Sequence, residues 1–399
     1  MSNQNREQVA VWGTGKVGRC FYYKHRNELD VKFFIDNYPK RNQIDNIPVI
    51  TPEHMDSDIK IIIAVADYFD ICNQCESMGK QFIVDYFPYD FYEENQISFV
   101  FLHRLFRIEK VKEIIRKANL IKRTIVIIGN CQTQMIKKML FASNAFKKDY
   151  ILIDIPPIYE CDDTMVGLFE QVELFKTVSL ILSQNISKNN GYTDLLSTEI
   201  VKKQRGEKTK IVIIPTLYFD VYFPQTIHQS CSNYFLKEVG ITSYPYGDWL
   251  LDELSKKYQY QDVCEIVEID NLFDKTLMGR IKEYRFAELK HREEQCNITI
   301  VDFIEKNYKT QQLFYCKNHP NNNLLSELTR RILASLGYFD YVYISSRYTE
   351  MDQYSEAIYP SVYKALQLDF PIRGYKDVLY GGMNLSGFVK NYILAKCSR

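Results

Sequence analysis

The sequence contains no long apolar run and no excess of charge of either sign. Its 399 residues include 50 Lys and Arg and 50 Asp and Glu, so the formal net charge is zero. Proteins that bind nucleic acid usually carry a basic excess, so we expect no nucleic-acid partner. No apolar run approaches the roughly 18 residues that cross a bilayer, so we expect no membrane span. The longest apolar strings, at 124–128 and 211–214, are short and β-branched and predict buried strands.

Signals for secretion, disulfides and zinc are also missing. The first residues show no basic segment followed by an apolar one, which favours a cytoplasmic protein. The ten cysteines are irregularly spaced, so free thiols in a reducing compartment are expected. Cys72 and Cys75 form one CxxC pair, but no second pair or histidine pair follows, and we therefore expect no metal site.

Short apolar strings alternate with helical patterns along most of the chain, which predicts parallel sheets covered by helices. In the first part, strands are expected at 8–12, 31–35, 60–66 and 81–86, and helices at 16–28 and 68–79. A charged helical pattern covers 99–121. Further strands are expected at 124–129, 150–154, 178–183, 210–215 and 312–316, and helices at 131–143, 164–175, 194–204 and 322–336, with 246–310 mainly helical.

This pattern predicts an α/β protein of two domains. The first, at 1–95, is a Rossmann-like parallel-sheet domain. A connecting helix follows at 96–122. The second domain, at 123–399, is another α/β domain of SGNH- or flavodoxin-like type with extra helices.

Three glycines follow the first predicted strand in the pattern GxGxxG. Gly13 would make the tight turn, Gly15 would let a pyrophosphate approach the backbone, and Gly18 would let the helix pack closely. Asp36 ends the second strand, where a carboxylate can hold a ribose hydroxyl. These residues predict a site for a nucleotide or nucleotide-sugar, and a scaffold that binds no ligand is the alternative. The segments 34–39 (FIDNYP) and 47–50 (IPVI) resemble the N-terminal domains of bacterial sugar acyltransferases, which implies a nucleotide-sugar.

A polar turn follows the strand at 124–128. Gly129 suits a tight turn, and Cys131 stands where a helix begins, at the edge of the sheet where α/β proteins bind ligands. The helix N-terminus lowers a thiol pKa and stabilises negative charge. The amides of Asn130 and Gln132 are candidate donors to a developing oxyanion. A buried cysteine without a chemical role is the alternative.

His319 is the strongest candidate among the six histidines for acid–base chemistry. It lies on a predicted polar loop with Lys317 and Asn318, and Pro320 is compatible with the first turn of the next helix. His228 is the second candidate.

Further residues are candidates for contacts with a cofactor. Gln184 ends a predicted strand and so faces the same edge of the sheet. Arg280, Arg285 and Lys317 could hold phosphates, because guanidinium and ammonium groups suit phosphate oxygens. For each of these basic residues, a solvated position on a helix face is the alternative.

Several of these motifs together resemble the WcbI-type polysaccharide biosynthesis proteins. They are GNCQ at 129–132, PTLYF at 215–219 with YFP at 222–224, DFI at 302–304, LF at 313–314 and NHP at 318–320, and they span about 123–340. The resemblance implies a coenzyme A-binding acetyltransferase that acts on sugars of a capsular or other surface polysaccharide. It also implies an SGNH-like layout, from which the chain departs. Asn130-Cys131 stands where those enzymes have Asp-Ser. Their Asp-x-x-His spacing is also absent, because Cys316 occupies the position three residues before His319.

The leading hypothesis is acetyl transfer from acetyl-CoA to a sugar hydroxyl. His319 would accept the proton, Gly129, Gln184, Asn318 and the basic residues would contact the coenzyme, and Cys131 would be either a nucleophile or a lining residue. The expected partner is a sugar or polysaccharide precursor, with association with a polysaccharide assembly complex. An esterase using Cys131 and His319, and a non-catalytic nucleotide-sugar-binding scaffold, remain alternatives. A dehydrogenase would need an acid–base residue next to a nicotinamide that the sequence does not offer.

Overall fold

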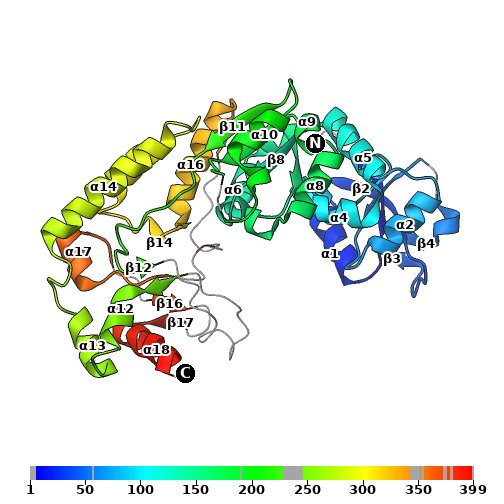
Figure 1. Cartoon of the computed structure of the whole chain (residues 1–399). Coiled ribbons are helices and arrows are strands. Elements are labelled where there is room, and N and C mark those ends of the chain that lie inside the picture. Colours follow the sequence, from blue (N-terminus) through cyan, green and yellow to red (C-terminus); the bar gives the residue numbers. More distant parts are fainter. Residues whose placement is uncertain are drawn as a thin grey trace. The chain divides into compact units, whose positions relative to one another are not determined.

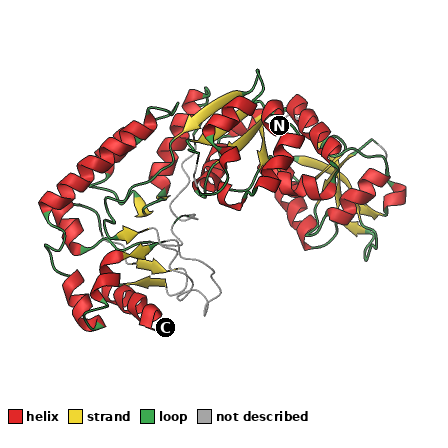
Figure 2. Cartoon of the chain, in the orientation of Figure 1, coloured by secondary structure: helices red, strands yellow, loops and turns green. Residues whose placement is uncertain are grey.

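The chain folds into two compact units. The computed structural model describes residues 6–55, 58–188, 191–227, 246–341, 351, 355–371, 375–377 and 381–397 (Figure 1). The first unit comprises Met1–Ile128, Asn144–Leu182 and Lys188–Ile211. The second comprises Gly129–Ser143, Ser183–Ser187 and Val212–Arg399. Strands and helices alternate through the first half of the chain, which confirms the predicted α/β class (Figure 2).

A six-stranded sheet occupies the front of the first unit, in the order β3-β4-β2-β1-β5-β6. Its strands are β1 (Glu7–Trp12), β2 (Leu29–Ile35), β3 (Gln43–Ile44), β4 (Ile47–Ile50), β5 (Lys60–Ile63) and β6 (Tyr86–Pro88). All neighbours pair in parallel except β3 and β4. Helices α1 (Lys16–His25), α2 (Phe69–Ser77) and α3 (Tyr89–Glu94) accompany it. The apolar strings of β1 and β5 are almost wholly buried, as continuous hydrophobic strands of a parallel sheet should be.

The strand predicted at 81–86 is wrong in position. Residues 81–85 form a turn, in which Ile83 has a φ of 68° and the Asp85 carboxylate accepts from the backbone N–H of Gln81 at 2.8 Å. The strand β6 begins only at Tyr86. The apolar residues at 82–84 have the pattern of a strand, but the hydrogen bond between Gln81 and Asp85 holds them in a turn.

A second sheet has five strands in the order β11-β10-β8-β9-β7. They are β7 (Gln96–Ser98), β8 (Arg123–Ile128), β9 (Tyr150–Asp154), β10 (Leu180–Gln184) and β11 (Lys210–Ile214). The helices of this part of the chain are α4 (Phe99–Leu105), α5 (Ile108–Ile121), α6 (Gln132–Phe141), α7 (Asn144–Asp149), α8 (Asp163–Gln171), α9 (Leu174–Thr177) and α10 (Thr198–Gln204). The segment 96–122, predicted as a connecting helix, therefore also supplies β7, which pairs in parallel with β9. Three residues are too few for a strand pattern to show in the sequence.

The remainder of the second unit is mainly helical, as predicted for 246–310. It contains α12 (Trp249–Leu254), α13 (Tyr260–Val267), α14 (Lys275–Glu293), α15 (Val301–Asn307), α16 (Asn322–Ser335), α17 (Pro360–Leu366) and α18 (Leu385–Cys397). Three short hairpins accompany them: β12 (Thr226–Ile227) with β13 (Gly247–Asp248), β14 (Phe314–Cys316) with β15 (His319–Pro320), and β16 (Tyr375–Asp377) with β17 (Gly381–Met383).

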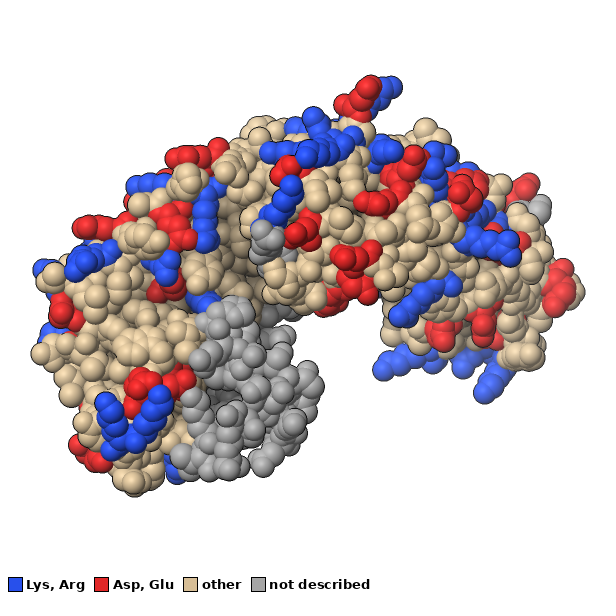
Figure 3. Space-filling model, in the orientation of Figure 1, with Lys and Arg blue, Asp and Glu red and all other residues tan. Residues whose placement is uncertain are grey.

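The surface agrees with the balanced composition. Lys and Arg alternate with Asp and Glu over the face drawn in Figure 3, and neither sign dominates it. Among the described residues, no helix combines the length and the apolar character that crossing a membrane requires.

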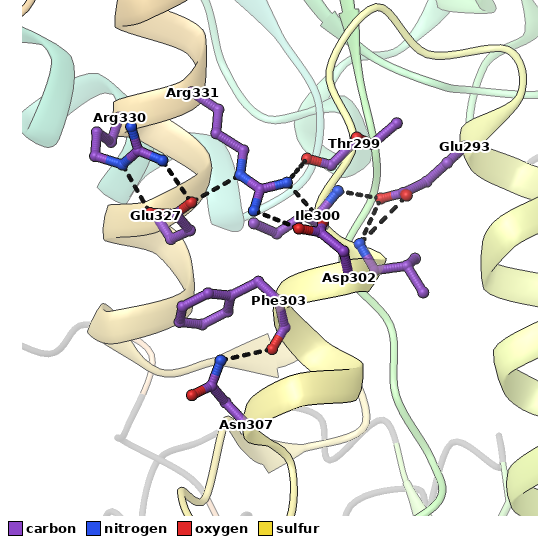
Figure 4. A network of polar contacts seen from close by, with 10 residues as sticks. Glu293, Thr299, Ile300, Asp302, Phe303, Asn307, Glu327, Arg330 and Arg331 are labelled. Atoms are coloured by element: carbon purple, nitrogen blue, oxygen red, sulfur yellow. Dashed lines mark hydrogen bonds and ion pairs between the residues drawn. The ribbon is translucent and has the colours of Figure 1, made fainter.

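Arg331 and Glu293 together link three helices of the second unit (Figure 4). From α16, its guanidinium donates to both carboxylate oxygens of Asp302 on α15, at 2.6 and 2.8 Å, and to the backbone carbonyl of Thr299 at 2.8 Å. Its Nε also donates to Glu327. At the start of α15, the Glu293 carboxylate of α14 accepts from the backbone N–H of Ile300 at 2.6 Å. These bonds fix α16 relative to α14 and α15, and α16 follows directly on the strand that carries His319.

We predict that Arg331→Ala lowers the free energy of unfolding by about 1–2 kcal/mol, because a bidentate, partly buried ion pair and a backbone contact are lost. The neighbouring Arg330→Ala should cost less than about 0.5 kcal/mol, since Arg330 is half exposed and bonds only Glu327. Urea denaturation of the two variants measures the difference, and equal losses would contradict the inference.

Candidate active site

The turn after β8 requires glycine at its first position. A Cβ atom on Gly129 would lie 2.4 Å from the Oε1 atom of Gln184 and 2.6 Å from the Thr133 side chain. Gln184, which is fully buried, uses that same Oε1 to accept from the backbone N–H of Asn130 at 2.8 Å. The close approach of Gln184 therefore fixes the turn. Gly129 and Gln184 were predicted to contact the coenzyme. In the structure they pack against each other and shape the turn, and the contact with a coenzyme stays a prediction.

Gln132, the first residue of α6, is buried and has every polar position of its side chain occupied. Its Nε2 donates to the backbone carbonyls of Leu217 and Asn318, each at 2.7 Å. Its Oε1 accepts from the backbone N–H of Leu217 at 3.1 Å and from Gln184 at 2.9 Å. The prediction that this amide donates to an oxyanion is therefore wrong, because no N–H remains for a substrate. Gln132 instead positions the segments that surround it.

Asn130 keeps a free donor. Its Oδ1 accepts from the backbone N–H of Gln132 at 3.0 Å, which orients the amide. Because that bond requires an oxygen, the NH₂ group must point the other way. Within the described residues, this NH₂ group has no hydrogen-bond partner. Of the two predicted amides, Asn130 is the one that can donate to a ligand.

Cys131 occupies the N-cap position of α6 and is partly exposed. Burial raises the pKa of its thiol, and the backbone N–H groups of Cys131 and Gln132 counteract this only in part. The predicted lowering of this thiol pKa is therefore wrong, because burial outweighs the helix terminus. No hydrogen bond joins Cys131 to His319 in the described part of the chain, so the thiol is not activated as in a Cys–His pair.

His319 lies in β15, which pairs with β14 in a short antiparallel hairpin. Its Nδ1 is buried and has no hydrogen-bond partner among the described residues. Burial lowers the pKa of the ring, and a backbone contact with Met351 counteracts this. The imidazole is therefore neutral at neutral pH, with one ring nitrogen available. The bond from Gln132 to the carbonyl of Asn318, the preceding residue, ties this strand to the start of α6.

One detail of the predicted histidine loop is corrected. Pro320 lies in β15 and not in the first turn of α16. That helix is capped by Asn321, whose side chain accepts from the backbone N–H of Leu324 at 2.9 Å. The side chain of Asn318, predicted to contact the coenzyme, accepts from the Cys316 thiol at 3.3 Å.

The predicted phosphate-binding residues differ in their surroundings. Arg280 is exposed on α14 and has no ion pair in the described structure. Arg285 is engaged with Asp220 and Glu288, each at 2.7 Å, so its guanidinium is already committed. Lys317 is only 5% exposed and lies over the ring of Tyr246, with 4.2 Å between its Nζ and the ring centroid. Neither Arg285 nor Lys317 is a freely accessible phosphate ligand.

The predicted nucleotide site lies in the first unit. Gly13 has a φ of 130°, and a Cβ on Gly18 would lie 1.9 Å from the Gly13 carbonyl, so both positions require glycine. Gly15 has open space around it. The Asp36 carboxylate accepts from the Thr14 hydroxyl and from the backbone N–H of Tyr38. The glycines thus have the predicted packing roles, while a bound nucleotide stays a prediction.

Two further expectations concern other parts of the chain. His228, the second histidine candidate, lies outside the described residues. In the part of the chain that the structure describes, no group of His, Cys, Asp and Glu side chains is arranged to hold a metal ion.

The strand, polar turn and histidine hairpin can now be compared with known proteins. The family model of the polysaccharide biosynthesis enzyme WcbI matches residues 124–340, more than half of the chain. The chain belongs to the WcbI family. It is therefore a polysaccharide biosynthesis enzyme by family, as the resemblance of its motifs implied, and the match begins at β8 and ends after α16.

A solved structure of WcbI shares the fold. It is 19% identical to this chain with a TM-score of 0.58, and the match covers 70% of this chain and 91% of that one. It is described as the native protein without a disulfide bond between coenzyme A and one of its cysteines. No curated protein sequence matches the chain. At this identity, the structural likeness establishes the fold of the WcbI-family member and leaves its substrates to be inferred from its own residues.

We predict that Gln132→Leu lowers the free energy of unfolding by about 3 kcal/mol or more. Leucine fills a similar volume but leaves the backbone groups of Leu217 and Asn318 buried without partners. The matched control is Gln134→Leu on the same helix, because Gln134 is partly exposed and makes no side-chain hydrogen bond in the described structure. Thermal and urea unfolding compare the two, and a tolerated Gln132→Leu would show that these bonds are dispensable.

Alkylation of Cys131 should be slow at neutral pH. Because burial raises the pKa of this thiol above its usual value, the reactive thiolate fraction should increase about tenfold per pH unit between pH 7 and pH 8. Peptide-resolved mass spectrometry after iodoacetamide treatment measures the rate, with exposed Cys20 as the reference for reagent access. Fast labelling at pH 7 that levels off by pH 8 would mean that the helix terminus outweighs burial.

Proposed function

We propose that the chain transfers an acetyl group from acetyl-CoA to a sugar hydroxyl of a surface polysaccharide or its precursor. The observation that carries this proposal is a pair of unused groups, one at the strand-to-helix turn and one in the hairpin that Gln132 ties to the start of α6. The Asn130 amide has an oriented N–H with no partner, and His319 has a buried ring nitrogen with no partner. Membership of a polysaccharide biosynthesis family supports a sugar acceptor, and the mention of coenzyme A for the solved WcbI structure supports the donor.

The residues around the turn are suited to a thioester. Cys131 is partly exposed at the N-terminus of a ten-residue helix, at the edge of the sheet where α/β proteins hold ligands. We place the thioester carbonyl beside Cys131, with Arg280 as the guanidinium free to approach a phosphate of the coenzyme. The commitment of Arg285 to Asp220 and Glu288 argues against the same role for it.

In this proposal His319 acts as the general base. Burial keeps its imidazole neutral, so the unpartnered Nδ1 can accept the proton of the attacking sugar hydroxyl. The Asn130 NH₂ group and the backbone N–H of Cys131, which has no hydrogen-bond partner among the described residues, donate to the oxygen on which negative charge develops. One such donor is typically worth about 3–4 kcal/mol of transition-state stabilisation.

We assign Cys131 a lining role and not that of a nucleophile. Its raised pKa keeps the thiol protonated, and within the described residues no histidine is hydrogen-bonded to it. The front sheet, with its glycine turn and Asp36, is proposed to hold the nucleotide of an activated sugar.

Calorimetric titration with CoA and acetyl-CoA, followed by transfer assays with labelled acetyl-CoA and a panel of sugars, tests this function. We expect Asn130→Ala to lower kcat by about 10²- to 10³-fold and His319→Asn by about 10²- to 10⁴-fold, with coenzyme affinity retained. His291→Asn, an exposed histidine on α14, is the matched control. Cys131→Ser should remain active.

The other outcomes separate the alternatives. No binding of either coenzyme by the wild-type protein would overturn the proposal. Ester hydrolysis without coenzyme, dependent on Cys131 and His319, would instead identify an esterase. Inactivity of Cys131→Ser together with ping-pong kinetics would make this residue the nucleophile.

A further inference from the structure

Lys317 brings a buried positive charge close to the turn, and nothing in the described structure bonds it. Its side chain lies between two aromatic rings, with Nζ 4.2 Å from the centroid of Tyr246 and 5.9 Å from that of Tyr218. No hydrogen-bond acceptor or ion-pair partner reaches the ammonium from the described residues. Ring faces compensate only part of the cost of removing an ammonium from water. The three N–H donors therefore require acceptors that the described protein does not supply.

Two carboxyl oxygens near Lys317 accept no hydrogen bond from the described residues. Oδ1 of Asp220 and Oε1 of Glu356 are buried without a hydrogen-bond partner among the described residues. The second oxygen of each carboxylate is occupied, by Arg285 at 2.7 Å and by the Thr226 hydroxyl at 2.9 Å respectively. Burial raises the pKa of Glu356 to about 8, so this group is largely protonated at neutral pH, whereas Asp220 is paired with Arg285. Each carboxyl group is thus held in place with one oxygen unused.

The charges of these groups influence one another. The charges of Glu356 and Asp220 both raise the pKa of Lys317, which burial lowers, and both also raise the pKa of the Tyr218 phenol. Yet neither carboxylate is within 4.0 Å of the ammonium, since no ion pair forms. The Tyr218 hydroxyl makes no hydrogen bond in the described structure. An ammonium, two carboxyl groups and a hydroxyl therefore lie in one region of the fold without bonding one another.

The cluster is tied to the proposed active site. The backbone carbonyl of Lys317 accepts from Phe219 at 2.7 Å, which joins the two chain segments that carry Tyr218, Asp220 and Lys317. Gln132 bonds the neighbouring residues Leu217 and Asn318, so both segments are fixed to the start of α6. Cys131 also contributes to the electrostatic surroundings of Tyr246.

We propose that Tyr218, Asp220, Tyr246, Lys317 and Glu356 form the binding subsite for the acceptor sugar. Sugar hydroxyls donate and accept at once, so they can satisfy the unused carboxylate oxygens and the ammonium together. Tyrosine rings offer a flat apolar surface for the C–H face of a pyranose. This assignment rests on the proposed function and names the substrate side of that reaction.

Saturation-transfer NMR on the full-length protein tests the subsite without any acetyl transfer. The probes are methyl α-galactopyranoside, methyl α-glucopyranoside and N-acetylglucosamine. We expect at least one to receive saturation from the wild-type protein. The dissociation constant of that sugar should increase about tenfold in Lys317→Met and in Tyr218→Phe. Such an increase corresponds to the loss of one hydrogen bond to a charged or polar group. Tyr258→Phe, on an exposed tyrosine, is the matched control.

Two outcomes would overturn the subsite. One is the absence of saturation transfer to all three sugars. The other is unchanged affinity in both Lys317→Met and Tyr218→Phe. Tyr218 is partly exposed and loses only a hydroxyl, so its variant should fold even where Lys317→Met does not. Coenzyme binding without sugar binding contradicts the subsite alone, whereas sugar binding without transfer from acetyl-CoA contradicts the proposed reaction and leaves the subsite.

Discussion

The side chain of Gln132 is the constraint on which the candidate site depends. Its four hydrogen bonds reach residues 85 and 186 positions away in the sequence, as well as Gln184 at the end of β10. One buried amide therefore brings together the start of α6, the segment after β11 and the hairpin that carries His319. Because three of its partners are backbone groups, the geometry depends on the path of the chain more than on the identity of neighbouring side chains.

Asn130 and Gln132 show how this constraint separates residues that look alike in sequence. Both are amides that flank Cys131, and both were candidates for oxyanion donors. The longer side chain of Gln132 reaches into the interior, where all of its polar groups are hydrogen-bonded. The shorter Asn130 bonds its own backbone two residues on, as such side chains commonly do, and keeps its NH₂ group. Chain length and direction, set by the helix start, decide which amide is left for chemistry.

Much of the fold was predictable because its signals are local. The alternation of apolar strings with helical patterns identified β8, α6 and α16, and GxGxxG identified the turn after β1. The sequence did not reveal β7, which has three residues, nor the turn at 81–85. The surroundings of Lys317 were also hidden, because Tyr246 and Glu356 lie far from it in sequence. Local patterns carry no information about such contacts, which the tertiary fold alone creates.

The thiol of Cys131 illustrates how burial can leave a helix terminus available. A thiolate at this position would itself occupy the backbone N–H groups of Cys131 and Gln132. Burial raises the pKa and keeps the thiol neutral, so the N–H of Cys131 is not neutralised by an anion of the protein, while the N–H of Gln132 already donates to the Asn130 side chain. In the proposed reaction the Cys131 N–H can then act together with the Asn130 amide on charge that develops only in the transition state, which is where stabilisation increases the rate. The cysteine thus contributes most by remaining uncharged.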